Sequence, residues 1–549
     1  MSLFRLLSFL FTFLYLAACT TPGTTTAPQP SSNVKRVIVI GLDNYHFDDV
    51  QAKMPNLYGF LQKGALSAKS HHPSLPTKTA PGFATIASGQ YPARHGVLNN
   101  SFLTPGGNPP ARAGFGYWEN LAKRSPPTFL TTPPWESFNA AGWDVGAIGW
   151  QGLVLENKDE ATGYLGRTPS DAELDRYWGI AIHRKDGKAQ LGVAEIPELQ
   201  EEFASGWVNG WAGPPLKSAS ITLRMGTRLL AAGVPFVFIY VENTHQRCTA
   251  GATPPCQGNL AAGTFDDLLR ADDGAFGRFF GDLEKLGVTP ANTLFVVTTD
   301  EGDHYVANGA RPVDASDLQP AVIGVNSHFY GPDADAIGAA LAKRGGFHSF
   351  ATREAMKALH IASAPDARLP TLTAFSDPET TYVTRPCAPC GRWNHGTIHP
   401  DITDIWLGVV GPGVRQGALD AYTDHADILP TVRALLGLPA STEYDGVAIT
   451  PALNTRTSDD LLRLRTAFKD LNAPFGTFGT RVLAISTKGV LAGADARAAA
   501  DARIRDLAGK RGSLVGEMRA VLDGKAGESS DQMRDLLRRV QSLLDEAAR

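Results

Sequence analysis

Four short, continuously apolar runs limit the folds open to this chain more than any other feature of the sequence. The runs span residues 37–40, 236–241, 293–299 and 405–411. Apolar runs of this length without polar alternation are typical of strands buried on both faces, as in a parallel sheet. Helical patterns at 221–232 and 266–286 lie between them. The alternation predicts an α/β fold with a doubly wound, mostly parallel sheet.

Ionisable residues follow three of these runs. Asp43 comes after the first, Glu242 and His245 after the second, and the segment 300–304 (DEGDH) after the third. Ligands of open α/β sheets bind outside the carboxyl ends of the strands. We therefore expect these side chains to meet in one functional site.

The N-terminus reads as a targeting segment. Arg5 precedes an apolar run, 6–18, that is too short to span a bilayer. The run ends in small residues and Cys19, as a bacterial lipobox does, so we predict a lipoprotein signal peptide over 1–18 and lipid on Cys19. The alternative is an ordinary secretory signal followed by a chance cysteine. Thr20 follows Cys19, which predicts an exported protein anchored in the cell envelope, at the outer membrane facing the periplasm if the cell has two membranes.

The rest of the chain divides by composition. Residues 19–33 have almost no apolar content and are predicted to be a disordered tether. One large α/β domain is expected over 34–453, with a Gly-, Pro- and Trp-rich, substrate-facing insertion at 101–217. A helical segment is expected over 454–549, ending in an amphipathic helix at 531–549.

The net charge and the cysteine content further limit the functional class and the compartment of the protein. The net charge is −4 without a basic block, which argues against a protein that binds nucleic acid through charge. Besides Cys19, four cysteines remain, and local pairs Cys248–Cys256 and Cys387–Cys390 fit an exported protein. A zinc site at Cys387 and Cys390 is the alternative.

The segment 76–82 (PTKTAPG) is the sharpest chemical signal. Pro81 suits the first turn of a helix running through Ala87, which places Thr79 at the helix N-terminus. Free N–H groups favour an anion there, and a metal-activated hydroxyl can attack phosphorus. The alternative is that Thr79 is only a helix cap.

Together with 41–43, 54–57 and 88–92, this segment resembles the opening of the nucleotide pyrophosphatase/phosphodiesterase family, part of the alkaline-phosphatase superfamily. The resemblance covers roughly 37–453 in patches and implies an alkaline-phosphatase-like catalytic domain. It implies that Thr79 is the nucleophile and a metal ligand, and that Asp43 is a zinc ligand.

The chain departs from the family pattern at two places. Gly82 stands where the family has a phosphate-binding asparagine, so a donor must come from Asn99 or Asn100, or be absent. Asp300 matches the family's aspartate, but Glu301 stands where a histidine is expected. Either Glu301 or His304 is then the metal ligand. The alternative is that the whole segment 300–304 is a solvated acidic loop without a metal.

For a second metal the resemblance implies Glu242, His245 and His395, with His399 as a bystander and His425 as structural. The spacing of Glu242 and His245 is one residue shorter than in the family. Mixed histidine and carboxylate ligands suit two divalent ions, zinc first, with manganese or iron as alternatives.

The expected activity is hydrolysis of a phosphodiester or pyrophosphate bond through a phosphothreonine intermediate. The substrate is a small phosphate ester, with nucleotides among the candidates. Phosphomonoester hydrolysis on the same site is the first alternative, and a catalytically degenerate surface lipoprotein that binds a ligand is the second. Sulfatase action is disfavoured, because the segment after Thr79 lacks the cysteine or serine and the arginine of that motif.

Overall fold

The fold was analysed in a computed structural model. It describes residues 33–103, 112–114, 132–150, 152–154, 179–199, 219–241, 265–306 and 309–549, with isolated residues between 162 and 173. Gaps in the last range are 315–317, 319–322, 326, 364–368, 384–392, 456 and 528. The predicted signal peptide, Cys19 and nearly all of the tether lie outside the described residues, as do Glu242, His245 and the other four cysteines.

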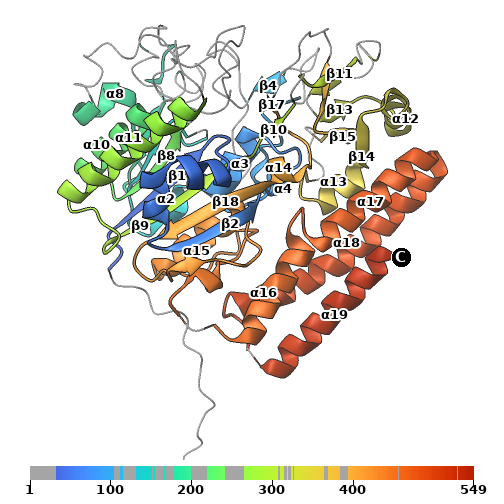
Figure 1. Cartoon of the computed structure of the whole chain (residues 1–549). Coiled ribbons are helices and arrows are strands. Elements are labelled where there is room, and N and C mark those ends of the chain that lie inside the picture. Colours follow the sequence, from blue (N-terminus) through green and yellow to red (C-terminus); the bar gives the residue numbers. More distant parts are fainter. Residues whose placement is uncertain are drawn as a thin grey trace, which may run out of the picture.

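A nine-stranded mixed sheet forms the centre of the molecule (Figure 1). Its strand order is β19-β2-β18-β9-β1-β8-β5-β6-β7, where β19 is the short strand Gly417–Ala418. Four neighbouring strands in the middle run parallel: β9 (Thr293–Thr299), β1 (Arg36–Leu42), β8 (Phe236–Val241) and β5 (Val145–Ile148). Beside β9, β18 (Asp404–Val410) runs antiparallel and pairs with β2 (Ala65–His71). The four apolar runs thus became β1, β8, β9 and β18.

Helices cover both faces of this sheet. Along β1, Ile38 and Ile40 pack with α1 (Phe47–Lys53), α2 (Pro55–Leu61), α10 (Ala219–Ala231) and α11 (Phe265–Lys285). Val37 and Val39 point to the opposite face, into a cluster with α3 (Thr79–Ser88), α5 (Glu136–Ala140) and α15 (Ile428–Leu435). Buried side chains on both faces confirm the predicted doubly wound α/β fold.

The strand register brings the predicted site residues to one edge. Leu42 pairs with Val241 on one side and with Thr299 on the other. The Asp43 N–H donates to the Val241 carbonyl at 2.9 Å, and the Asp300 N–H donates to the Leu42 carbonyl at 2.9 Å. Asp43 and Asp300 therefore leave the sheet side by side.

The stretch expected to be an insertion is partly built into the main sheet. It contributes β5 and, beyond it, β6 (Ile180–His183) and β7 (Ala189–Leu191) at the sheet edge. A separate four-stranded sheet lies farther along the chain and consists of β12 (Ile323–Val325), β13 (His328–Tyr330), β15 (Leu372–Ser376) and β14 (Phe347–Ala351). It packs with α12 (Ala334–Arg344).

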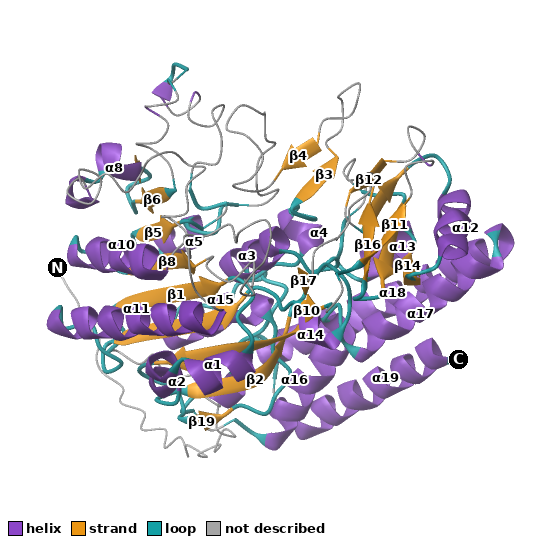
Figure 2. Cartoon of the chain, turned by 45° about the horizontal axis from the view of Figure 1, so that its top comes forward, coloured by secondary structure: helices purple, strands orange, loops and turns teal. Residues whose placement is uncertain are grey.

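The C-terminal part of the chain is helical. It comprises α16 (Asp459–Asn472), α17 (Thr477–Ala492), α18 (Ala494–Leu522) and α19 (Ser530–Ala548), grouped on one side of the molecule (Figures 1 and 2). Their apolar faces share one core with Ala80 and Ala84 of α3. These helices thus support the helix that begins at Thr79. Across the described residues, no helix combines the length and the apolar character needed to cross a bilayer.

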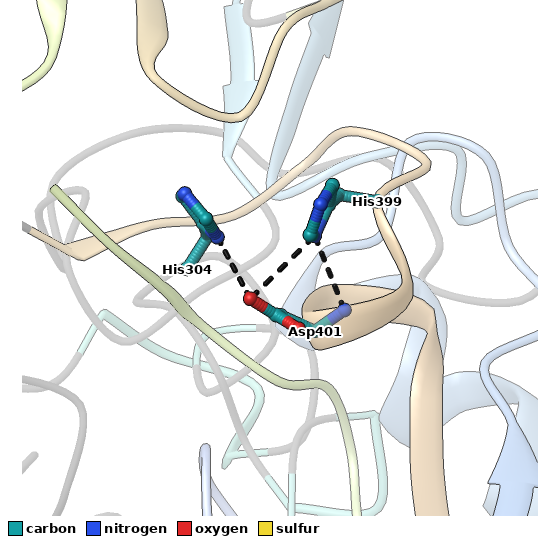
Figure 3. A group of neighbouring side chains, drawn as sticks. All are labelled: His304, His399 and Asp401. Carbon is teal, nitrogen blue, oxygen red and sulfur yellow. Dashed lines mark hydrogen bonds and ion pairs between the residues drawn. The ribbon is translucent and has the colours of Figure 1, made fainter.

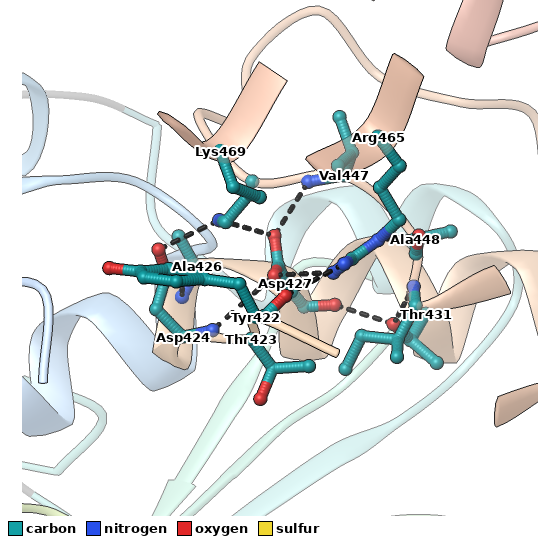
Figure 4. A network of polar contacts seen from close by, with 12 residues as sticks. Tyr422, Thr423, Asp424, Ala426, Asp427, Thr431, Val447, Ala448, Arg465 and Lys469 are labelled. Atoms are coloured by element: carbon teal, nitrogen blue, oxygen red, sulfur yellow. Dashed lines mark hydrogen bonds and ion pairs between the residues drawn. The ribbon is translucent and has the colours of Figure 1, made fainter. Parts of the chain in front are cut away.

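A buried ion network joins α16 to the segment before α15 (Figure 4). Lys469 Nζ lies 2.7 Å from Asp424 Oδ2 and 2.9 Å from Asp427 Oδ1. Arg465 reaches the other Asp427 oxygen at 2.9 Å. These four side chains are almost inaccessible to solvent, so each charge depends on its partners.

Candidate active site

Thr79 is the first residue of α3, and Lys78 before it is extended. The side chain of Thr79 is only 5% exposed, and its hydroxyl donates to Glu301 Oε1 at 3.0 Å. The Ala80 N–H, the next donor of the helix start, is bonded to Asn100 Oδ1 at 2.8 Å. The amide of Asn100 therefore lies at the start of α3, against the residue that follows Thr79, and is the candidate for the donor that Gly82 cannot supply.

Three carboxylates meet next to Thr79. Asp43, Asp300 and Glu301 are buried, and one oxygen from each lies within 4.8 Å of the others. Asp300 Oδ2 makes no hydrogen bond. Burial, together with the charges of Asp43 and Glu301, raises the pKa of Asp300 well above its usual value. Three buried acids in contact cannot all ionise without a cation, so this donor set fits a divalent metal ion.

Two residues hold Asp43 in place. The Asn44 side-chain amide donates to Asp43 Oδ1 at 2.6 Å, and the Tyr240 hydroxyl donates to Asp43 Oδ2 at 2.7 Å. The Asn44 backbone N–H also donates to Asp300 Oδ1 at 3.2 Å. Asn44 has a φ of 61°, in the left-handed region, which asparagine tolerates better than most residues. This conformation lets one residue bond both aspartates.

His395 contacts the same cluster through Glu301. Its Nδ1 lies 3.0 Å from Glu301 Oε1 and 3.2 Å from Lys78 Nζ. The loop is tied down by Thr77, whose hydroxyl donates to the Thr397 carbonyl at 2.8 Å and accepts from the Gly396 N–H at 3.1 Å. Burial lowers the pKa of Lys78. Its ammonium group is directed at His395, through both the ring and the backbone carbonyl.

His304, the other candidate for the Glu301 position, lies elsewhere. It pairs with Asp401 and faces His399 (Figure 3). Of the predicted ligands that the structure describes, Asp43, Thr79, Asp300, Glu301 and His395 lie together. Strand β8 ends at Val241, immediately before Glu242, but the positions of Glu242 and His245 are not described.

Sequence reasoning missed three residues of this site: Asn44, Tyr240 and His72. A Cβ atom at Gly82 would lie 3.1 Å from His72 Nε2 and 3.4 Å from the Asp300 Cβ, so α3 passes close to both. That contact explains why a small residue follows Pro81. Asn44 could have been found, because a polar residue after a buried strand and an aspartate is a usual turn position. Tyr240 could not, since it lies inside an apolar run.

The sequence was compared with known families and proteins. The model of the type I phosphodiesterase/nucleotide pyrophosphatase family matches residues 37–416. Ectonucleotide pyrophosphatase/phosphodiesterase 1 of Saccharomyces cerevisiae is 35% identical over 75 residues, which are 12% of this chain. The chain thus spans about a tenth (10%) of the length of that curated relative.

Solved structures share the fold at low identity. Human ectonucleotide pyrophosphatase/phosphodiesterase 5 has a TM-score of 0.53 at 15% identity, covering 76% of this chain and all (100%) of that one. An inactive variant of the murine protein, in complex with AMP, has a TM-score of 0.51 at 15% identity and covers 74% and 96%. A mutant of the alkaline phosphatase PafA has a TM-score of 0.55 at 14% identity and covers 78% and 100%.

Proposed function

Because the chain belongs to the type I phosphodiesterase/nucleotide pyrophosphatase family, we propose that it is a metal-dependent hydrolase of phosphodiester or pyrophosphate bonds with Thr79 as nucleophile. The hydrogen bond from Thr79 to the buried cluster of Asp43, Asp300 and Glu301 is the observation that carries this proposal. It joins a hydroxyl at a helix start to three predicted metal ligands.

Different residues of the chain have different roles in the covalent step. Thr79 Oγ1 forms the bond to phosphorus while the ester oxygen on the far side leaves. Glu301 Oε1 already accepts the hydroxyl hydrogen and can take the proton. The NH₂ group of Asn100, whose amide oxygen accepts the Ala80 N–H at the start of α3, provides an N–H donor for a phosphoryl oxygen. Water then cleaves the phosphothreonine and restores the hydroxyl.

Two divalent ions, zinc in the first place, would be held by two ligand groups. One group is Asp43, Thr79, Asp300 and Glu301; the other is His395 with His245 and Glu242. When bound, such ions lower the pKa of the attacking hydroxyl and neutralise the leaving oxygen. Asp300 Oδ2, buried and without a hydrogen bond, supports the first group.

We favour diesters over monoesters because of Lys78. A monoester carries an additional negative charge and calls for an additional cation near the phosphate. Lys78 is the residue next to Thr79, yet its ammonium group is bonded to His395. Nucleotides are the first substrates to test, given the family and the AMP bound to the murine relative.

The test is a rate comparison on a para-nitrophenyl phosphomonoester, a phosphodiester and a nucleotide pyrophosphate, with and without chelator. The proposal expects chelator-sensitive turnover that is fastest on a diester or pyrophosphate. A preference for the monoester would assign the alternative activity to the same site. Lack of turnover on all three, in a protein loaded with zinc, would indicate a binding lipoprotein.

We further propose that lipid on Cys19 anchors the protein in the cell envelope. A lipobox ahead of a polar tether motivates this. Cys19→Ala should release soluble protein or block processing. A variant that still fractionates with membranes as the wild type does would refute the anchor.

A further inference from the structure

His304, His399 and Asp401 form a second group of side chains that could hold a metal ion, separate from the group of three acids beside Thr79. Figure 3 shows how the three side chains face one another. Asp401 Oδ2 is 2.8 Å from His304 Nδ1 and 3.6 Å from His399 Nδ1. The two imidazole rings are 4.8 Å apart between centroids. One ligand atom from each of the three residues lies within 4.8 Å of the others.

These separations suit a small transition-metal ion. Zinc binds histidine nitrogen and carboxylate oxygen at about 2.0–2.2 Å, which places tetrahedral ligand atoms about 3.3 Å apart. The observed spacing therefore needs only small side-chain shifts. The side chains of His304 and His399 are 18% and 35% exposed, so an ion can enter from solvent and a water molecule can complete its shell.

We propose that His304, His399 and Asp401 form a divalent-metal site of the zinc class, distinct from the catalytic cluster. The metal site goes beyond the proposed hydrolase activity and does not depend on it; only its positioning role rests on that activity. A site with two imidazole nitrogens and one carboxylate oxygen binds zinc and related ions in preference to calcium or magnesium, which favour oxygen ligands.

The position of the cluster indicates what the ion does. His304 begins β10 (His304–Tyr305), three residues after Glu301. This strand pairs with β17 (Trp393–Asn394), which ends immediately before His395. A bound ion would therefore cross-link the two segments that carry Glu301 and His395, in addition to the two-residue strand pair between them. It is a positioning site for the catalytic loops.

The same two segments already touch at Gly302. Its N–H donates to the Ile402 carbonyl at 3.0 Å, and a Cβ on Gly302 would lie 2.0 Å from the Asp401 carbonyl oxygen. His399 is also the N-cap of α14 (Pro400–Thr403), accepting the Asp401 N–H at Nδ1 over 3.3 Å. A metal bound at Nδ1 replaces that long bond with a stronger one.

The test counts zinc ions on the full-length protein after gel filtration. The parent is Asp43→Asn/Asp300→Asn, in which the catalytic cluster is disabled. Either His304→Gln or His399→Asn is then added to this parent protein. Asparagine is chosen at position 399 because it can still cap α14. His71→Gln is the matched control, because His71 forms a His–carboxylate pair with Asp404 (3.5 Å) and has no place in the cluster.

The proposal expects His304→Gln and His399→Asn each to bind one zinc ion fewer than the parent, and His71→Gln to bind as many. The same loss of one ion is expected in the wild-type background. Equal zinc content in parent and variants, in both backgrounds, would overturn the site. A protein that shows the loss of one ion yet hydrolyses no phosphate ester would leave this site standing and remove only the proposed function.

Discussion

Thr79 and Glu301, 222 residues apart in sequence, are joined by a 3.0 Å hydrogen bond in which the threonine hydroxyl is the donor. The same Glu301 oxygen lies 3.0 Å from His395 Nδ1. One carboxylate therefore contacts the candidate nucleophile and a candidate ligand of the second metal. This places Glu301 at the centre of the site, at the position where the family pattern has a histidine.

Replacing Glu301 should impair turnover far more than replacing His304. Glu301→Gln keeps the size of the side chain but removes its charge, so we expect a loss of about 10²- to 10⁴-fold in kcat together with weaker metal binding. His304→Ala leaves the three-acid cluster in place and should cost much less. Steady-state kinetics measures both; zinc content does not separate them, because His304→Ala also removes a ligand of the proposed site at His304, His399 and Asp401. The reverse pattern would assign the catalytic ligand to His304.

The side chain of Asn44 should be required for full metal affinity and activity. Asn44→Gly permits the φ of 61° and keeps the backbone bond to Asp300, but removes the amide that orients Asp43. We expect metal affinity or activity to fall by about 10- to 100-fold, as for other residues that orient metal ligands. Asn44→Ala should lose the same amide and add backbone strain of about 1 kcal/mol. Zinc titration and thermal melting separate the two effects, and wild-type zinc affinity in Asn44→Gly would contradict this role.

Strand positions were readable from the sequence because burial on both faces leaves a continuous apolar run. Strands β1, β8 and β9 begin and end within one or two residues of their runs. The antiparallel direction of β18 was not readable, since an apolar run carries no sign of direction. Strands β5, β6 and β7 were missed because their stretch is rich in Gly and Pro and weakly periodic.

Only part of the candidate site could be predicted from the sequence, because only some of its residues lie at the ends of regular elements. Asp43, Thr79 and Asp300 follow or begin regular elements, so their convergence follows from topology. His399 was set aside as a bystander, and only the fold brings it to His304. Tyr240 bonds Asp43 because β8 and β1, which are far apart in sequence, are neighbours in the sheet. The spacing of residues along the chain does not predict such a contact.

Lys469 should be essential for the attachment of the C-terminal helices. Lys469→Met removes the cation that the buried Asp424 and Asp427 share, so Asp424 loses its ion-pair partner and Asp427 keeps only Arg465. Breaking such a pair costs about 3–5 kcal/mol of unfolding free energy. The control is Lys510→Met, since Lys510 forms only exposed pairs with Asp506 and Glu546 and should change stability little. Urea unfolding measures both, and equal midpoints would contradict the role of the network.

His328 should make the protein acid-sensitive. It is buried and bonded to the Leu98 carbonyl, next to Asn99 and Asn100, and burial lowers its pKa to about 4. The unfolded chain, with a histidine pKa of about 6.5, binds the proton more readily, so stability is lost as pH falls from that value toward 4. From pH 7 to 5 the loss is about 2 kcal/mol. His328→Gln, less stable at pH 7, should show a shallower decline, and parallel curves for the two proteins would refute the assignment.

Thr79 should carry the phosphoryl group during turnover. Thr79→Ala removes the attacking oxygen, so the covalent route disappears and the rate should fall by several orders of magnitude. The fold and most metal binding should remain, because the three carboxylates stay in place. Thr79→Ser keeps the hydroxyl and should retain partial activity. Rapid quenching with a diester labelled at phosphorus should trap the labelled phosphoryl group, which still carries its second ester substituent, on the wild type and on Thr79→Ser but not on Thr79→Ala.

Thr77 provides the comparison that separates chemistry from positioning. Its hydroxyl bonds to Gly396 and Thr397 and so fixes the loop that carries His395. Thr77→Ala should loosen that loop and lower activity moderately, yet still form the phosphoenzyme, because Thr79 is intact. Thr77→Ser keeps both bonds and should behave almost as wild type. If Thr79→Ala hydrolyses a diester at close to the wild-type rate, Thr79 is not the nucleophile, and the covalent mechanism is wrong whatever the fold.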